Sequence, residues 1–107
     1  EKMAEIKKAR DAALAVFTWD GSVFDANEAR LLGLKVRADS TADFPPVNWR
    51  LADNTWRQLT RGDALAVWDA FEANLRWCFE IFEALEIAVA QTGTADSLAQ
   101  IRWPASG

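Results

Sequence analysis

Apolar residues recur at alternating spacings of four and three through the second half of the chain, which is typical of one face of a long helix. The pattern predicts a helix from Arg61 to about Gln91. The residues of this seam are Ala64, Trp68, Phe71, Leu75, Cys78, Phe82, Leu85 and Val89. A second apolar stripe beside the seam consists of Trp77, Ile81, Ala84 and Ala88. The sheet of one small domain covers little more than one stripe, so the second stripe is expected to meet shorter helices or another subunit.

Aromatic and β-branched residues on both sides of Asp20-Gly21 predict a β-hairpin. A two-residue type I′ turn requires a positive φ at both central residues, and the Asp-Gly pair favours it. That turn pairs Trp19 with Ser22 and Phe17 with Phe24. It places Phe17, Trp19 and Phe24 on one face of the hairpin.

A second hairpin is predicted to turn at Ala52-Asp53-Asn54. A two-residue loop at this point would place Arg50 opposite Arg57, and two like charges in register destabilise a strand pair. We therefore expect a loop of three or four residues. After this hairpin, Thr60 and Asp63 have nearly the spacing of a capping box, which predicts the first turn of the long helix.

Shorter helices are expected before and between the hairpins. The first covers residues 1 to about 15, where apolar and charged residues alternate with a helical period. Another is predicted from about Ala26 to Arg37, capped by Asp25 or Asn27. Gly33 interrupts its apolar pattern and weakens its middle.

Residues 38–46 are predicted to form a linker, polar at first and closed by Phe44-Pro45-Pro46. Gly93 is expected to end the long helix as a C-cap, and a last short helix to begin at Thr94 and lead to Trp103-Pro104. The predicted fold is α+β, with two antiparallel hairpins packed against one long helix. Trp19, Phe24 and Trp49 should contact the seam residues Trp68, Phe71, Leu75 and Phe82.

The composition of the chain fits a folded globular protein and limits its partners. Half of the 107 residues are hydrophobic and 26% are charged, a balance that excludes a disordered tail. The formal net charge is -4 and the cationic residues form no stripe, so we expect no nucleic-acid partner. No apolar run is long enough to span a membrane. Because the sequence begins Glu1-Lys2-Met3, we expect it to be a fragment of a longer chain.

Residue types that carry catalysis are scarce. The chain has no histidine, which excludes the common nucleophile–histidine systems and the usual zinc sites. The single cysteine, Cys78, lies on the seam and is interpreted as a buried small hydrophobic residue. Asp20, Asp25 and Glu28 gather around the first hairpin, but the turn explains Asp20 and a helix cap explains Asp25. We expect no enzyme, no catalytic or metal-binding residues and no cofactor.

The six tryptophans are the unusual feature of the composition. Trp19, Trp49 and Trp68 are predicted to fill the core, whereas Trp77 and Trp103 fit either the core or a subunit interface. Exposed indoles can also stack on sugars or anchor a protein partner. A pair of exposed, coplanar tryptophans near the hairpin turns would favour a glycan-binding module, and burial of all six would exclude it.

Three short motifs resemble the uncharacterised domain found in tail-fibre and tail-associated proteins of tailed bacteriophages and prophages. The matching residues are Phe17, Trp19, Gly21, Phe24-Asp25-Ala26 and Ala29, then Trp49 and Asp53-Asn54, then Leu59-Thr60. The segment from Thr94 through Leu98 and Ile101 to Trp103-Pro104 also resembles the short terminal helix of that family. The resemblance extends over nearly the whole chain, as one domain over residues 1–107.

The resemblance implies a structural or accessory module of a phage or prophage tail, made in the cytoplasm of a bacterial host and located in the virion tail. Its expected partners are other tail proteins and further copies of the chain, as a trimer or a dimer, with no membrane partner. The candidate interface residues are Trp77, Ile81, Ala84, Ala88 and Trp103. Two alternatives remain open: a receptor- or glycan-binding module that uses tryptophans, and an assembly chaperone for a tail fibre.

Overall fold

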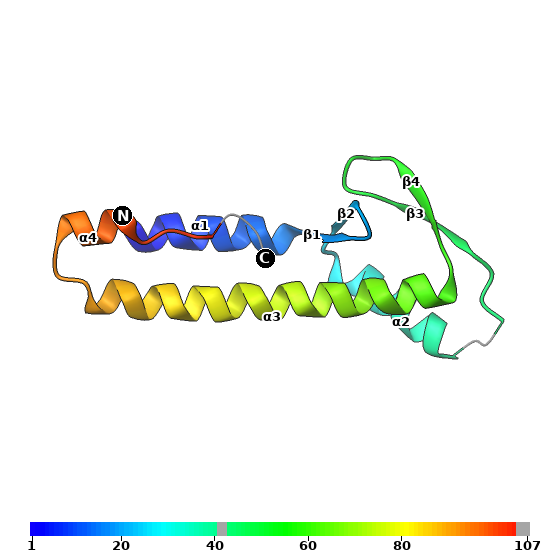
Figure 1. The fold of residues 1–107 in the computed structure, drawn as a ribbon. Coiled ribbons are helices and arrows are strands. Elements are labelled where there is room, and N and C mark those ends of the chain that lie inside the picture. Colours follow the sequence, from blue (N-terminus) through cyan, green and yellow to red (C-terminus); the bar gives the residue numbers. More distant parts are fainter. Residues whose placement is uncertain (41–42, 105–107) are drawn as a thin grey trace. The chain divides into compact units, whose positions relative to one another are not determined.

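The structure is a computed structural model that describes residues 1–40 and 43–104, and it has the α+β architecture predicted from the sequence (Figure 1). In chain order the elements are α1 (Lys2–Ala15), β1 (Val16–Trp19), β2 (Ser22–Asp25), α2 (Glu28–Ser40), β3 (Val47–Arg50), β4 (Trp56–Leu59), α3 (Arg61–Gln91) and α4 (Ala95–Gln100). The chain divides into two compact units. The hairpin unit comprises residues 15–73, and the helical unit comprises residues 1–14 and 74–104 of the described chain.

The first hairpin has the predicted register and turn. Strands β1 and β2 are antiparallel, with Trp19 opposite Ser22 and Phe17 opposite Phe24. Asp20 and Gly21 have φ values of 47° and 76°, the positive values that a type I′ turn requires. The rings of Phe17 and Phe24 stack with their centroids 5.4 Å apart, and both side chains are buried. The aromatic face of this hairpin therefore points into the core.

The second hairpin has the longer loop that was expected from its charges. The Leu51 N–H donates to the Thr55 carbonyl oxygen at 2.8 Å, which leaves Ala52, Asp53 and Asn54 as a three-residue loop. Asn54 has a φ of 68°, a left-handed conformation that asparagine tolerates better than most residues. In this register Arg50 lies opposite Trp56 and Trp49 lies opposite Arg57. The two arginines are thus not in direct opposition.

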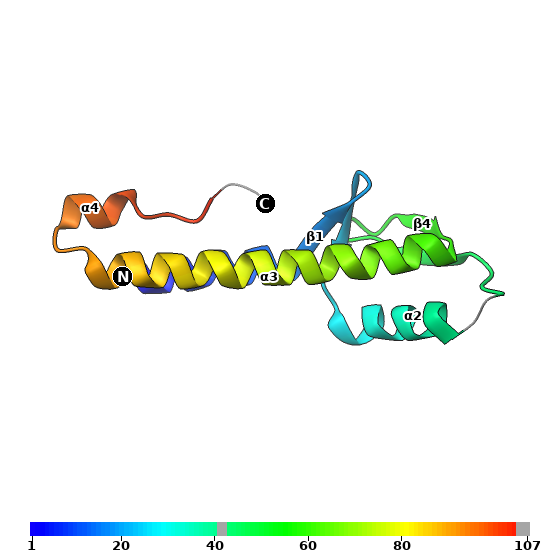
Figure 2. The ribbon, with the colours of Figure 1, turned by 60° about the horizontal axis from the view of Figure 1, so that its bottom comes forward.

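The core of the hairpin unit is formed by both hairpins, α2 and the first part of α3. Its buried residues are Phe17, Phe24, Leu31, Leu34, Ala38, Leu51, Leu59, Ala64, Val67 and Phe71. Phe71 connects α3 to the first hairpin, since its ring centroid lies 5.8 Å from that of Phe17. Figure 2 shows α2 alongside the first part of α3. Trp19, Trp49 and Trp68, which were predicted to fill the core, are partly buried and pack against it.

The predicted bounds of α2 were wrong at both ends. The helix begins at Glu28, because the Asn27 side chain caps it: the Arg30 N–H donates to Asn27 Oδ1 at 3.1 Å. It continues through Gly33 to Ser40, so the first residues of the predicted linker are helical. Ala38 is fully buried, which explains the extension: it continues the apolar repeat of this helix into the core. Residues 41 and 42 of the predicted linker lie outside the described part of the chain.

The predicted cap is confirmed at the start of α3 but not at its end. At the start, the Asp63 N–H donates to Thr60 Oγ1 at 3.2 Å and the Thr60 N–H donates to Asp63 Oδ2 at 3.0 Å. This reciprocal pair confirms the capping box. At the other end, the glycine cap was wrong, because Gly93 is not left-handed. The Thr92 hydroxyl donates instead to the Ala88 carbonyl at 2.7 Å and satisfies one of the last carbonyls of the helix.

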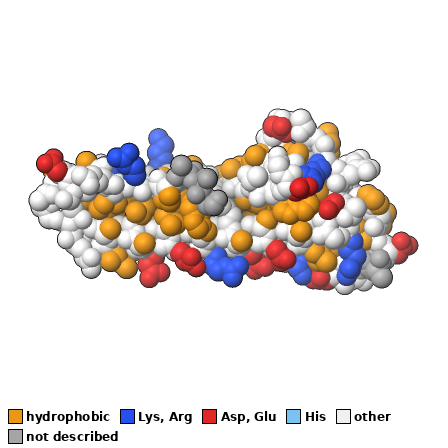
Figure 3. Space-filling model, viewed as in Figure 1, with side chains coloured by type: hydrophobic (Ala, Val, Ile, Leu, Met, Phe, Trp, Pro, Cys, Tyr) orange, Lys and Arg blue, Asp and Glu red, His pale blue; other side chains and the backbone are white. Residues whose placement is uncertain are grey.

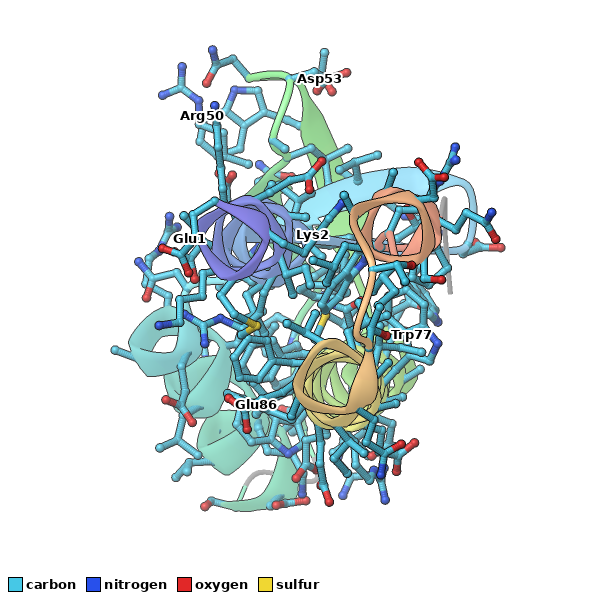
Figure 4. All side chains as sticks on the ribbon, turned by 90° about the vertical axis from the view of Figure 1, so that its left-hand side faces the viewer. Glu1, Lys2, Arg50, Asp53, Trp77 and Glu86 are labelled. Carbon is cyan, nitrogen blue, oxygen red and sulfur yellow. The ribbon has the colours of Figure 1, made fainter. Side chains whose placement is uncertain are left out.

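In the helical unit, α1 runs antiparallel to the second part of α3. Near the end of α1, Asn74 Nδ2 donates to the Ala13 carbonyl at 3.1 Å, and one turn earlier the Arg10 guanidinium lies over the Phe82 ring, 4.5 Å from its centroid. The end-on view of Figure 4 shows α1, α3 and α4 as neighbouring helices. Ile6 and Cys78 are the fully buried side chains of this unit among the described residues.

Of the four seam residues expected against the hairpins, Trp68 and Phe71 lie in the hairpin unit. Leu75 and Phe82 belong to the helical unit, where Phe82 lies under Arg10. The residues of the seam therefore do not all pack into one continuous core. Its first residues pack against the hairpins, and its later residues belong to the helical unit.

Candidate functional site

Arg57 connects the two hairpins within the hairpin unit. It lies on the inward face of β4, two residues before the buried Leu59. Its guanidinium donates at 2.9 Å to the Asp20 carbonyl and to Ser22 Oγ, and it forms an ion pair with the Asp20 carboxylate. The same guanidinium lies 4.7 Å from the centroid of the Trp19 ring. Arg57 thus holds the turn of the first hairpin against the second.

Replacing Arg57 by alanine should lower the free energy of unfolding by roughly 1–2 kcal/mol, since hydrogen bonds to a charged group are lost but the pair is partly exposed to solvent. The Arg57→Lys variant keeps the positive charge but lacks the planar guanidinium with its several N–H donors. It should recover less than half of the lost free energy of unfolding. Chemical denaturation of the three proteins measures the differences. An unchanged midpoint for Arg57→Ala would show that the contact contributes nothing to stability.

The face of the second hairpin that points away from the core carries four exposed side chains. These are Asn48, Arg50, Trp56 and Gln58, here termed the outer face. Asn48 pairs with Gln58 and Arg50 pairs with Trp56, so the four form a two-by-two array. Trp56 is 63% exposed, and Arg50 Cζ lies 5.7 Å from the centroid of its ring. Figure 4 shows Arg50 and Asp53 projecting outward from this hairpin.

A shallow recess of about 550 Å³ lies between the turns of the two hairpins. It is lined by Gly21, Ser22, Val23, Leu51, Ala52, Asp53 and Thr55. The Asp53 carboxylate is already engaged, because it accepts hydrogen bonds from the Thr55 N–H at 3.0 Å and from the Thr55 hydroxyl at 2.6 Å. These hydrogen bonds lower the pKa of Asp53 below its ordinary value. The carboxylate thus stabilises the turn, as the sequence analysis interpreted it.

The candidate interface residues all belong to the helical unit. Trp77 and Trp103 contact each other edge to face, with ring centroids 5.8 Å apart, so the segment after α4 covers part of the second stripe. Both indoles are partly buried, as are Ile81 and Ala88, and Ala84 is exposed. Trp77 and Glu86 leave α3 on opposite sides (Figure 4). The second stripe is therefore partly covered by the chain itself and partly open.

Further large hydrophobic side chains are exposed outside both predicted stripes. On α3 they are Phe79, 51% exposed, and Ile87, and on α2 they are Leu32 and Val36. Phe79 and Ile87 fall outside the spacing of four and three that defined the two stripes of α3, so the sequence predicted no role for them. The acidic residues Glu72, Glu80, Glu83 and Glu86 of α3 are all exposed.

The carboxylates around the first hairpin do not form a paired acid. Asp20 contacts Arg57, Asp25 ends β2 on its exposed face, and Glu28 lies in the first turn of α2. Of the two caps predicted for this helix, Asn27 is confirmed and Asp25 was wrong. No cluster of three or more histidine, cysteine, aspartate or glutamate residues that could hold a metal ion occurs in residues 1–40 and 43–104. Among the helices in that same part of the chain, none is long and apolar enough to cross a membrane.

Cys78 is fully buried, as its seam position predicted. Burial raises the pKa of its thiol above the ordinary value, because the thiolate loses its hydration. A raised pKa lowers the fraction of reactive thiolate at neutral pH.

We expect Cys78 of the folded chain to react with a thiol-specific disulfide reagent at least about 100 times more slowly than the same residue in urea, because both its burial and its raised pKa oppose attack. The absorbance of the released thiolate follows the reaction. Equal rates in buffer and in urea would contradict the burial of this side chain.

Comparison with protein-family models identifies the family of this chain. The model of the family described as "Domain of unknown function (DUF4376)" matches residues 1–102. The chain belongs to this family. The match includes both hairpins, the whole of α3 and α4, so it confirms an uncharacterised domain as the sequence analysis expected. No curated protein and no solved structure matches the chain.

Proposed function

We propose that this DUF4376 chain is a non-enzymatic structural or accessory module of a phage or prophage tail, either in the tail fibre or in an associated component. The observation that carries the proposal is the resemblance of its hairpin and helix motifs to the domain of tail-fibre and tail-associated proteins. Those motifs, from Phe17 to Trp103-Pro104, are almost entirely contained in the segment that matches the family model. The proposed location is the virion tail, with synthesis in the cytoplasm of the bacterial host.

We further propose that the module self-associates through the second stripe of α3. This is supported by the partial exposure of that stripe: Ala84 is exposed, and Ile81 and Ala88 are only partly buried. Figure 3 shows hydrophobic side chains in a band over the helical unit, with charged side chains along one edge of α3. Large apolar surfaces on a protein mark contacts with partners more often than free surface. Closed cyclic symmetry, threefold or twofold, would repeat this contact in each subunit.

The tail location is tested with particles from a bacterium that encodes the chain. After induction, intact particles are separated from soluble protein by density-gradient centrifugation, and the chain is measured by mass spectrometry against the major tail and capsid proteins. A structural module should be present in purified particles at a fixed ratio to the tail proteins and should be lost with tail-less heads. If the chain is abundant in the lysate but absent from the particles, the structural assignment is wrong and an assembly chaperone is favoured.

Self-association is tested by sedimentation equilibrium of the full chain at several micromolar concentrations. A mass two or three times that of the 11.9 kDa chain is the expected result. A monomer at every concentration would overturn the self-association without affecting the tail location, which the particle experiment tests separately.

A further inference from the structure

The outer face of the second hairpin combines an aromatic ring with three hydrogen-bonding side chains and is otherwise unused by the fold. Trp56 is the most exposed large hydrophobic residue of the described chain, at 63%, whereas Trp19 and Trp49 pack against the core. Its neighbours are Asn48, Arg50 and Gln58. An exposed tryptophan contributes little packing energy to the core, and its indole face is accessible to a ligand.

The dimensions of the outer face correspond to one small ligand. Neighbouring strands lie about 5 Å apart, and alternate residues on a strand lie about 7 Å apart, so the two-by-two array has the size of one six-membered sugar ring with its substituents. A stable protein interface covers a much larger area, about 800 Å² on each partner. The array therefore has the area of a single sugar residue, whereas a protein partner would also have to cover the side chains around it.

The chemistry of the four side chains agrees with this size. The face of an indole attracts the weakly positive C–H groups on the apolar side of a sugar ring. Asn48 and Gln58 each present an amide donor and an amide acceptor, which suit hydroxyl groups that donate and accept at the same time. Arg50 carries the formal charge of the outer face. Its planar guanidinium can donate two parallel hydrogen bonds to the two oxygens of a carboxylate.

The position of Arg50 leaves it available to a ligand. Its Cζ lies over the Trp56 ring, 5.7 Å from the centroid and near the outer limit of a cation–π contact, so the ring holds the guanidinium only weakly. A carboxylate beside the ring would accept both hydrogen bonds from the guanidinium. The nearest acidic residue of the hairpin loop, Asp53, already accepts hydrogen bonds from Thr55.

From this array we infer that the outer face of the β3–β4 hairpin binds an acidic sugar residue, with Trp56 stacked on the ring, Arg50 paired with its carboxylate, and Asn48 and Gln58 bonded to its hydroxyl groups. The site goes beyond the proposed tail role and does not depend on it. Binding of one sugar residue should be weak, with a dissociation constant of roughly 1 mM, because the contact involves few atoms.

The test is a ¹H–¹⁵N NMR titration of the full chain with two probes, methyl β-glucuronide and methyl β-glucoside. The indole N–H peak of Trp56 is assigned by its loss in Trp56→Phe. With the glucuronide, this peak should shift and saturate, while the other indole peaks stay in place. The neutral glucoside should bind at least about tenfold more weakly, because it cannot pair with Arg50.

Two variants and a control locate the site. Trp56→Ala should abolish the saturable shifts of the neighbouring amides, and Arg50→Gln should reduce glucuronide affinity about tenfold while leaving glucoside affinity unchanged. Phe79→Ala removes an aromatic side chain that is also half-exposed but lies on α3, and it should bind as the unchanged chain does. Thermal melting checks that each variant is folded.

Three outcomes would overturn the inference. The first is the absence of a saturable shift at Trp56 with either probe up to about 50 mM, a concentration well above the expected dissociation constant. The second is an equal affinity for both probes that stays the same in the Arg50→Gln variant. This result would show that the site does not prefer an acidic sugar. The third is broadening of the Trp56 peak as the protein concentration rises without sugar, which would identify the outer face as a contact between copies of the chain.

Discussion

Replacing Phe71 by alanine should lower the free energy of unfolding by about 3–5 kcal/mol, the usual range for removal of a buried phenylalanine. Phe71 is 5% exposed, and its ring contacts those of Phe17 and Trp68, with centroid distances of 5.8 and 5.2 Å. The truncation would therefore open a cavity where α3 meets the first hairpin. Urea unfolding followed by circular dichroism measures the loss as a lower midpoint with an unchanged slope.

The matched control is Phe79→Ala, the same substitution on the same helix at a side chain that is 51% exposed. Its cost should be about 0.5 kcal/mol or less, because no cavity forms. If the two variants lose equal stability, Phe71 is not a core residue. A loss below about 0.5 kcal/mol for Phe71→Ala would have the same meaning and would contradict the packing of α3 on the hairpin.

Local signals in the sequence predicted most of the elements, because each signal has a local physical cause. Asp20-Gly21 determines a type I′ turn through two positive φ values, and the register of the first hairpin follows from that turn. Thr60 and Asp63 form the capping box through contacts three residues apart. Neither feature depends on distant parts of the chain, so both could be deduced before the fold was known.

Boundaries that depend on tertiary contacts were not predicted. The helix α2 extends to Ser40 because Ala38 is buried in the core, and Arg61 Nε donates to its carbonyl oxygen at 2.7 Å. On α3, Val67 is fully buried whereas Trp68 is half-buried. The spacing pattern fits either residue, and only the position of the hairpins decides between them.

The role of Arg57 was also missed, although the sequence contains a signal for it. Residues of a strand alternate between two faces, so Arg57 shares the face of Leu59 and Trp56 lies on the other. An arginine on the inward face requires a partner, and here the partner is Asp20 in the other hairpin. The same alternation assigns Trp56 to the exposed face, where the structure places it.

For the candidate interface, the sequence predicted the position of the stripe but not how far the chain covers it. The contact of Trp77 with Trp103 joins residues far apart in sequence, and no periodicity reveals it. Ala84 is exposed and Trp77, Ile81 and Ala88 are only partly buried, so part of the stripe stays accessible along α3. A test of the interface therefore requires a substitution at a position that the chain itself leaves exposed.

Ala84→Glu should weaken self-association at least about 100-fold. The substitution would place a negative charge from each copy in the same apolar interface, where the charges lose hydration and repel each other. Ala84 belongs to the second stripe and is exposed, so the glutamate extends into solvent in the isolated chain and leaves the fold intact. Sedimentation equilibrium measures the change in association, and circular dichroism with thermal melting measures the fold. The expected result is a folded monomer at concentrations where the unchanged chain is a trimer or a dimer.

The control for this prediction is Ala90→Glu, which introduces the same charge at another exposed alanine of α3. Six residues further along, Ala90 lies about 120° around the helix from Ala84 and therefore off the second stripe. It should leave the assembly unchanged. If both variants dissociate the assembly equally, net charge and not the stripe controls association. If Ala84→Glu stays fully associated, the second stripe is not the interface.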